Sequence, residues 1–262
     1  MVAAHRPVIN KPYRWLAKYY DQVLPDRSPL NGAREVILAP VLPSITSVCD
    51  LACGTGDTAL TFARGGLKVF GVDGSPAMVR AARRKMASAG LPARILRGDM
   101  RDFRLPEPVD LVTCEGDAVN HVYQKSDLTR VAAAVARALR PGGYFYFDVN
   151  NRKGFERYWN ATWCSEAPGV VMVLRSACDP AQDRAWSDVD WFIREGKCWS
   201  RRREHVEEVC WSAAEIRTAL KGAGFQTIRE FDAAPYFNSE FMQPGCRSMY
   251  LARKPVRIPI VG

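Results

Sequence analysis

Residues 48–56, Val-Cys-Asp-Leu-Ala-Cys-Gly-Thr-Gly, constrain the fold of this chain more than any other stretch. An apolar run around Val48 carries the carboxylate Asp50 at its end, and a turn with two glycines follows at once. A helical pattern then begins near Asp57. A strand, a tight turn and a helix start in this order bring the backbone close to a ligand. The carboxylate would attract a cationic or hydroxyl-bearing ligand and repel phosphate.

Three further apolar segments end in the same way. Residues 67–72 run into Asp73, residues 94–97 into Gly98-Asp99-Met100, and residues 109–113 into Cys114-Glu115-Gly116-Asp117. Ligands of open parallel sheets bind at the carboxyl ends of the strands. We therefore expect four acidic strand ends to line one cleft.

Strand-like and helix-like segments alternate from residue 46 to residue 149, which predicts a parallel sheet covered by helices on both faces. The clearest signals are Ser75-Pro76 at the start of a helix over 76–88 and Pro141-Gly142-Gly143 after a helix over 127–139. Two short helices are expected ahead of the sheet, at 12–22 and 33–42.

The pattern changes after residue 150. Residues 151–167 are aromatic and irregular, and three strand-like segments follow, separated by turn residues. They cover 170–177, 185–194 and 199–211 and predict an antiparallel ribbon. A helix at 212–222 and two final strands at 225–231 and 248–252 would complete the main sheet.

Five motifs stand in a characteristic order and spacing: DLACGTG (50–56), VFGVDGSPAMVRAA (69–82), RGDMRDF (97–103), DLVTCEGDAVNHV (110–122) and LRPGGYFYFDVN (139–150). Together they resemble the class I S-adenosylmethionine-dependent methyltransferases of the small-molecule type, similar to glycine N-methyltransferase-like and amino-sugar N-methyltransferase-like enzymes. The resemblance implies an α/β fold: a Rossmann-like, doubly wound, mostly parallel sheet of seven strands with an antiparallel last strand, plus a small antiparallel β insertion. The expected division is a helical cap at 1–44, the cofactor-binding core at 45–150, the insertion and substrate cover at 151–211, completion of the core sheet at 212–254 and a tail at 255–262.

S-adenosylmethionine carries a sulfonium, an amino-acid end, a ribose diol and an adenine, and the resemblance implies a partner for each. Asp73 would accept both ribose hydroxyls, Asp99 the adenine amine, and Asp50 would lie near the amino-acid end. Glycines in the turn let the backbone approach without a Cβ clash. The full expected cofactor-binding set is Tyr20, Asp50, Ala52, Cys53, Gly54, Gly56, Asp73, Gly74, Met78, Asp99, Met100, Glu115 and Gly116.

The three aspartates also have structural interpretations. Asp73 could cap the helix that begins near Pro76, Asp99 could cap a turn, and Asp50 could bind the amides of the glycine turn. The chain departs from the family pattern at Ala52, which replaces the usual first glycine. A methyl group is tolerated there if the residue keeps a negative φ.

Methyl transfer from a sulfonium is an in-line displacement, so positioning and desolvation supply much of the catalysis, and an amine acceptor must only lose its proton. Glu115, Asp117 and His121, just past the fourth strand, are the candidate proton acceptors. We favour His121 because its ordinary pKa suits neutral pH, and a packing or helix-start role is an equal alternative. Asn120 could orient the substrate.

Aromatic side chains are frequent in residues 151–211. They could cover the cleft and hold a cationic or ring-shaped substrate, or they could form the core of the ribbon or a contact in a homodimer. The six tryptophans in question are Trp159, Trp163, Trp186, Trp191, Trp199 and Trp211.

Composition argues against several other classes. No apolar run approaches the roughly 20 residues that span a bilayer, and the first 15 residues lack the apolar core of a signal peptide, so no membrane partner and a cytoplasmic address are expected. The net charge of +9 is spread along the chain, which disfavours a nucleic-acid partner. The eight cysteines form no C-x-x-C pair and the three histidines are scattered, so neither a metal site nor a disulfide framework is expected.

The predicted function is S-adenosylmethionine-dependent methyl transfer to a nitrogen or oxygen nucleophile of a small molecule. A methyltransferase acting on RNA or protein is an alternative, which the absence of an N/D-P-P-Y/F motif and of a Pro-Cys pair disfavours. A nicotinamide-dependent oxidoreductase is a third, since residues 54–59 satisfy G-x-G-x-x-G/A, but Asp50 and Asp57 would oppose its pyrophosphate. A cofactor-binding regulatory protein without catalysis is the fourth.

Overall fold

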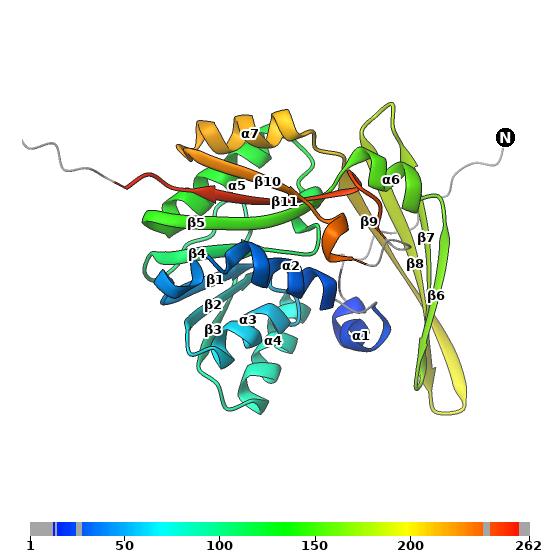
Figure 1. Ribbon diagram of the computed structural model, residues 1–262. Coiled ribbons are helices and arrows are strands. Elements are labelled where there is room, and N and C mark those ends of the chain that lie inside the picture. The colour runs from blue at the N-terminus through cyan, green and yellow to red at the C-terminus, as the bar shows by residue number, and fades with distance from the viewer. Residues whose placement is uncertain (1–12, 14, 25–27, 238–241, 257–262) are drawn as a thin grey trace, which may run out of the picture.

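The computed structural model describes residues 13, 15–24, 28–237 and 242–256, and two sheets dominate it (Figure 1). The larger sheet has the strand order β10-β11-β5-β4-β1-β2-β3. Its neighbouring strands are parallel except at β11, which runs antiparallel to β5 and to β10. The strands are β1 (Ser47–Leu51), β2 (Lys68–Asp73), β3 (Ala93–Arg97), β4 (Val109–Cys114), β5 (Leu139–Asn150), β10 (Thr227–Asp232) and β11 (Arg247–Arg253). The predicted fold class is confirmed.

Helices cover both faces of this sheet (Figure 1). One face carries α5 (Lys125–Ala138) and α7 (Ala213–Gly222), and the other carries α2 (Ser28–Leu38), α3 (Asp57–Arg64) and α4 (Pro76–Ser88). Within β1, Cys49 and Leu51 pack toward α5 and α7, whereas Val48 packs toward α2 and α3. Because strand side chains alternate between faces, Asp50 points the same way as Val48.

Helix boundaries follow the local signals closely at α4 and less closely at α2. Ser75 caps α4, since its hydroxyl accepts the Met78 N–H, and Pro76 occupies the first turn, as predicted. The predicted helix at 33–42 instead begins at Ser28 and ends at Leu38, ahead of Pro40. A proline disfavours helical backbone in the residue before it, which explains the early end. A short 3₁₀ turn, η1 (Leu42–Ser44), follows before the sheet begins.

The smaller sheet is an antiparallel ribbon of four strands, β6 (Thr162–Ala167), β7 (Val170–Asp179), β8 (Arg184–Glu195) and β9 (Cys198–Val209). The three predicted strands are present, and the prediction of an irregular stretch at 151–167 is wrong. That stretch holds α6 (Arg152–Tyr158) and β6. β6 is an edge strand exposed along most of its length, so it lacks the buried alternation by which a strand is recognised in sequence.

The N-terminal helix α1 (Leu16–Val23) packs between the two sheets and against one face of the ribbon (Figure 1). Tyr19 stacks on the buried Trp191 with ring centroids 6.2 Å apart. The Glu204 carboxylate on β9 accepts the N–H groups of Trp15 and Leu16 at 2.8 and 3.3 Å. The ribbon therefore holds the start of α1 in place. The predicted helix at 12–22 begins later than expected, and its residues 12 and 14 lie outside the described residues.

The ribbon is also tied to the main sheet through η2 (Ala118–His121). The fully buried amide of Asn120 donates to the carbonyls of Asn150 and Val209, at 3.0 and 2.8 Å. Asn120 therefore has a structural role and does not orient a substrate. Its contacts connect the end of β5 to the end of β9.

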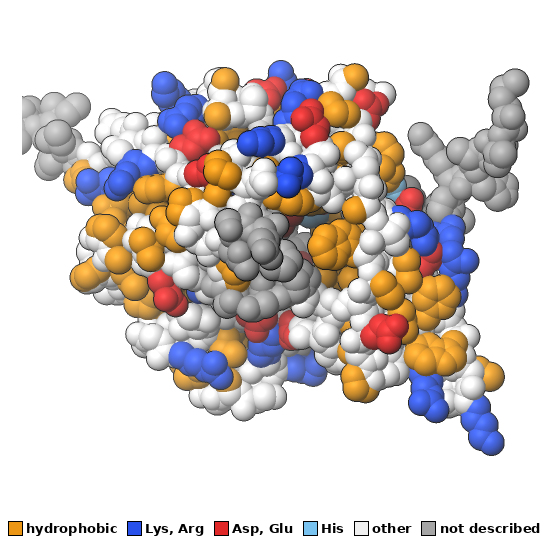
Figure 2. Space-filling model, turned by 45° about the vertical axis from the view of Figure 1, so that its right-hand side comes forward, with side chains coloured by type: hydrophobic (Ala, Val, Ile, Leu, Met, Phe, Trp, Pro, Cys, Tyr) orange, Lys and Arg blue, Asp and Glu red, His pale blue; other side chains and the backbone are white. Residues whose placement is uncertain are grey.

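The aromatic residues of 151–211 are divided between buried and exposed positions. Trp191 and Trp211 are buried in hydrophobic clusters, which supports the interpretation that some of these rings form cores. Trp163 and Trp199 are 56% and 52% exposed. Hydrophobic and basic side chains lie next to one another over this part of the surface (Figure 2). No helix in the described part of the chain has both the length and the apolar character needed to cross a membrane.

Candidate active site

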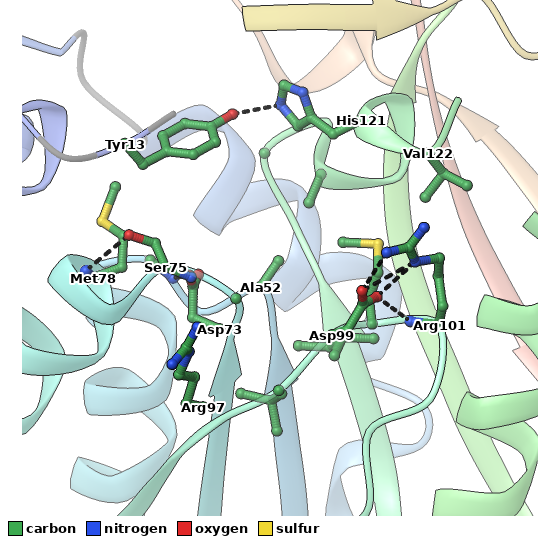
Figure 3. A pocket seen from close by; sticks show the side chains of 18 of the residues that line it. Tyr13, Ala52, Asp73, Ser75, Met78, Arg97, Asp99, Arg101, His121 and Val122 are labelled. Carbon is green, nitrogen blue, oxygen red and sulfur yellow. Dashed lines mark hydrogen bonds and ion pairs between the residues drawn. The ribbon is translucent and has the colours of Figure 1, made fainter. Parts of the chain in front are cut away.

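A cavity of about 750 Å³ opens at the carboxyl ends of β1 to β4, beside α1 and β9 (Figure 3). The structure brings most of the predicted site residues together around it. Those that line it are Tyr20, Ala52, Gly54, Asp73, Gly74, Met78, Asp99, Met100, Glu115, Gly116 and His121. Asp50, Cys53 and Gly56 do not line it. The expectation that consecutive acidic strand ends meet in one cleft holds for three of the four, at positions 73, 99 and 115.

Asp73 holds the glycine turn in place. Its Oδ2 accepts the Gly54 N–H at 2.9 Å and its Oδ1 accepts the Ser75 N–H at 2.7 Å. Each carboxylate oxygen retains a further acceptor site for a ligand hydroxyl. Burial raises the pKa of Asp73, and the two N–H donors partly oppose that rise. A Cβ built on Gly54, where φ is +54°, would meet no atom within 4 Å, so this backbone faces open space.

Ala52 departs from the expected backbone conformation. Its φ is +56°, in the left-handed region, so the condition of a negative φ is wrong. The chain turns sharply as soon as β1 ends, and the Cys53 N–H bonds the Val72 carbonyl of β2 at 3.1 Å. A non-glycine residue in this region costs about 1–2 kcal/mol. The turn therefore carries strain that a glycine would not.

The three predicted residues that do not line the cavity stabilise its base. Asp50 is buried, and its carboxylate accepts the Ala59 N–H of α3 at 3.1 Å and the Thr113 hydroxyl of β4 at 3.2 Å. It therefore anchors α3, as its position on the Val48 face of β1 requires. Burial raises the pKa of Cys53, which packs under Gly71. A Cβ on Gly56 would lie 3.0 Å from that of Ala82, so this glycine permits close packing of α3 on α4.

Asp99 is bound to Arg101, a lining residue that the sequence did not single out. The Arg101 Nε lies 2.9 and 3.1 Å from the two Asp99 oxygens, and its Nη1 lies 3.0 Å from Asp127 (Figure 3). Hydrogen bonds from Arg101 lower the pKa of Asp99. An adenine amine would therefore share this carboxylate with an arginine, which the spacing of 99 and 101 alone did not reveal.

Glu115 forms a buried ion pair with Arg34 of α2. Arg34 Nη1 lies 2.9 Å from Glu115 Oε2, and both side chains are less than 5% exposed. Protonation of Glu115 would leave the guanidinium buried without its countercharge, which is unfavourable. This disfavours Glu115 as a proton acceptor. Asp117, the second acidic candidate, does not line the cavity and binds Asn150 Nδ2 at 2.7 Å.

His121 is held by hydrogen bonds at both ring nitrogens. Nδ1 lies 2.9 Å from the Glu207 carbonyl oxygen of β9, and Nε2 lies 2.8 Å from the Tyr13 hydroxyl (Figure 3). A carbonyl only accepts, so Nδ1 carries the proton and Nε2 accepts from Tyr13 when the ring is neutral. Burial, followed by the charge of Glu208, raises the pKa of Tyr13 well above its usual range, which keeps its hydroxyl protonated. The basic nitrogen of His121 therefore points toward Tyr13 at the edge of the cavity.

Several lining residues were missed by sequence reasoning. Tyr13 lies in the aromatic N-terminal segment, which was the one available signal for it. Tyr123 and Val122 follow His121 directly, and Val206 is the one ribbon residue among the described lining residues. No tryptophan is among them, so a tryptophan cover over the substrate is not observed. In the described part of the chain, no group of three His, Cys, Asp or Glu residues is arranged to hold a metal ion.

Comparison with known proteins agrees with this geometry. A methyltransferase domain family matches residues 48–143, the stretch that supplies β1 to β4 and the start of β5. YqeM of Bacillus subtilis (strain 168), named as a methyltransferase, is 28% identical over 83% of this chain and 87% of its own length. A dTDP-4-amino-2,3,4,6-tetradeoxy-D-glucose N,N-dimethyltransferase of Saccharopolyspora spinosa is 40% identical over 39% of each chain. A ubiquinone biosynthesis O-methyltransferase of Klebsiella pneumoniae is 31% identical over 56% of this chain and 55% of its own.

Solved structures share the fold over nearly the whole chain. An S-adenosylmethionine-dependent methyltransferase from Clostridium acetobutylicum superposes with a TM-score of 0.77 at 24% identity, covering 94% of this chain and all of that one. DesVI of Streptomyces venezuelae superposes with a TM-score of 0.75 at 20% identity, with the same coverage. The chain therefore shares its fold with these methyltransferase structures, and its residues 48–143, which hold the glycine turn and the acidic strand ends, match the methyltransferase domain family.

Proposed function

We propose that this enzyme methylates an amine nitrogen of a small molecule and that His121 Nε2 accepts the proton that the nitrogen loses. The observation that carries the proposal is the hydrogen-bonding of His121. Its Nδ1 proton is committed to the Glu207 carbonyl, so Nε2 is the proton-accepting nitrogen and binds the Tyr13 hydroxyl in the structure. A histidine with its tautomer set in this way suits general-base catalysis at neutral pH.

The lining residues fit S-adenosylmethionine. Asp73 has acceptor sites left for the ribose hydroxyls, Gly54 presents bare backbone to the cavity, and Met100 lies next to Asp99 where the adenine would pack. Tyr20 of α1 would close over the methionine end. When bound, the cofactor supplies a methyl group on a sulfonium, whose sulfur takes the electron pair of the breaking bond.

The residues of the chain then have two tasks, which are to orient the acceptor and to take up the proton that it loses. The cavity orients the acceptor so that its nitrogen lone pair meets the methyl carbon in line. On methyl transfer the acceptor nitrogen would lose one proton, and His121 Nε2 would take it. For this step Tyr13 must turn its hydroxyl proton away from Nε2 or move aside, since it occupies that nitrogen in the structure.

The named relatives support nitrogen as the acceptor and keep oxygen as a second candidate. The S. spinosa relative is named for N,N-dimethylation of an amino sugar, and the K. pneumoniae relative is named for O-methylation. A phenolic hydroxyl, like an amine, would have to give up a proton, and the same His121 could accept it.

The test is a screen for formation of S-adenosylhomocysteine from amines, amino sugars, phenols and peptide amines. We expect turnover with an amine-bearing small molecule, and a loss of about 10²–10⁴-fold in kcat for His121→Asn with cofactor affinity unchanged. Glu166→Gln, an exposed change on β6, is the matched control and should behave as wild type. Turnover with phenols alone, or full activity of His121→Asn across the pH range, would contradict the proposal.

A further inference from the structure

The outer edge of β9 offers main-chain carbonyl groups that β8 does not use. β9 is the last strand of the ribbon, so only one of its edges pairs with another strand of that sheet. Strands in an antiparallel pair exchange hydrogen bonds through alternate residues. The Cys210 N–H bonds the Asp183 carbonyl at 2.9 Å, and the series of residues that face β8 continues with Glu208. The carbonyl groups of Glu207 and Val209 therefore point away from β8.

Two consecutive residues of η2 bind these two carbonyl groups. The Asn120 amide nitrogen donates to the Val209 oxygen at 2.8 Å, and His121 Nδ1 donates to the Glu207 oxygen at 2.9 Å. The Tyr123 hydroxyl makes a longer contact with the same Glu207 oxygen, at 3.4 Å. Proteins usually pair or cover the free edge of a sheet. Here η2 covers it, and is attached to β9 at two adjacent points.

Asn120 is also fixed from the side of the main sheet. Its fully buried amide donates to the Asn150 carbonyl at 3.0 Å and accepts the Asn150 N–H at 3.0 Å. With the bond to Val209, the amide uses two donors and one acceptor, which leaves it a single orientation. The Asn150 side chain in turn donates to Asp117, directly before η2, at 2.7 Å. The end of β5 therefore holds η2 on one side while β9 holds it on the other.

The Glu207 carbonyl is the partner that decides which nitrogen of His121 carries the proton. A carbonyl oxygen only accepts, so the Nδ1 that binds it must be protonated. The Tyr13 hydroxyl, 2.8 Å from Nε2, can donate to an unprotonated nitrogen or accept from a protonated one, so it selects neither form. Without the Glu207 contact, the neutral ring could carry its proton on Nε2, and that nitrogen could not accept another.

We propose that Asn120 is a positioning residue that keeps Nε2 of His121 unprotonated by holding η2 against the free edge of β9. Its bond to Val209 sets the distance between η2 and β9, and His121, the next residue, then reaches Glu207. Its two bonds to Asn150 keep η2 aligned with the end of β5. The inference rests on the proposed function only for the catalytic meaning of His121, because the position of the ring proton is a property of the folded chain alone.

The experiment measures the nitrogen chemical shifts of the histidine rings by nuclear magnetic resonance. It uses the full chain without cofactor or acceptor, at a pH at which the rings are neutral, because these shifts distinguish a protonated from an unprotonated ring nitrogen. The chain has three histidines, at positions 5, 121 and 205, and loss of one set of signals in His121→Asn assigns the ring of interest. In the wild-type chain we expect the His121 proton on Nδ1.

We expect Asn120→Ala to raise the share of His121 rings that carry the proton on Nε2 by about fivefold, since the loss of one hydrogen bond shifts an equilibrium by about that factor. Asn151→Ala is the matched control. It also removes a side-chain amide, whose nitrogen binds Gly245 and Ser248 at 3.2 and 2.9 Å, near the start of β11. The control should leave the proton of His121 on Nδ1.

A wild-type His121 with its proton on Nε2, or an Asn120→Ala variant whose proton stays on Nδ1, would overturn the inference. An equal change in Asn151→Ala would also overturn it, because the change would then reflect a general loss of stability. If Asn120→Ala fails to fold, Asn120→Ser decides, since its hydroxyl can replace only part of the amide and should move the proton in the same direction. The measurement needs no methyl transfer. Failure of the proposed function would appear instead as absence of amine methylation in the acceptor screen.

Discussion

The cavity has two halves that are built in different ways. The proposed cofactor half uses residues at strand ends that are held by neighbours in the chain, as when Asp73 binds the N–H two positions ahead and that of Gly54, 19 positions back. The proposed acceptor half brings His121 to Tyr13 across 108 positions and to Glu207 across 86. A site made of local turns leaves motifs in the sequence, whereas a site made by packing of distant segments leaves almost none.

The largest expected effect tests whether the cofactor half also depends on a distant contact. Arg34→Met removes the partner of Glu115 and leaves a buried carboxylate, so the free energy of unfolding should fall by about 3–5 kcal/mol. Lys68→Met breaks the exposed pair with Glu107 and should cost less than about 1 kcal/mol. Urea unfolding of both variants makes the comparison. Equal losses in the free energy of unfolding would show that the buried ion pair contributes no more to stability than the exposed pair.

A second test separates the two halves by function. Asp73→Asn should weaken S-adenosylhomocysteine binding by about 1–3 kcal/mol, because the neutral amide is a poorer acceptor for hydroxyl and N–H donors. Titration calorimetry measures this, with the exposed Asp102→Asn as control. Because His121 is assigned to the acceptor half, His121→Asn should keep the wild-type affinity. Unchanged affinity in Asp73→Asn would remove Asp73 from the cofactor half.

The buried carboxyl group of Glu208 should make the stability of the folded chain depend on pH. Since the pKa of Glu208 is raised on folding, the folded chain keeps a proton that the unfolded chain releases above its pKa of about 4.3. Stability is therefore lost as the pH rises between these two pKa values, by about 1.4 kcal/mol per pH unit. Glu208→Gln should be more stable than wild type at neutral pH, and the gain should shrink toward pH 4. A gain that is the same at both pH values would contradict this origin.

The smallest effect concerns strain in the cofactor half. Ala52→Gly removes the strain of a positive φ, which costs about 1–2 kcal/mol for a non-glycine residue. The greater conformational freedom of glycine in the unfolded chain offsets part of this gain in stability. We expect a net gain of less than about 1 kcal/mol in thermal or urea unfolding. Ala81→Gly, inside α4, should have the opposite sign and lose about 0.5–1 kcal/mol. A loss at position 52 would mean that the turn is not strained.

Sequence reasoning succeeded where a local rule specifies structure. Ser75 and Pro76 marked the start of α4, and the apolar runs ending in Asp73, Asp99 and Glu115 marked strands whose ends share a cavity. It failed at Asp50 even though the signal was present. Alternation along β1 puts Asp50 on the side of Val48, toward α3 and away from the cavity.

Other features could not be predicted because no local rule encodes them. The exposed edge strand β6 has no periodic burial, and the positive φ of Ala52 follows from how β1 meets the turn. The contacts of Arg101 with Asp99 and Asp127, and of Arg34 with Glu115, depend on which helices and loops meet across the sheet.

By itself, the sequence determined the mostly parallel sheet, its glycine turn and the acidic strand ends, because hydrophobic periodicity, capping residues and glycine act over a few positions. Only the tertiary structure decided that Asp50 and Glu115 are engaged in structural contacts, that Tyr13 meets His121, and that Glu208 is buried. The contacts of His121 depend on how η2 and the ribbon pack, because its two partners lie 108 and 86 positions away in the chain.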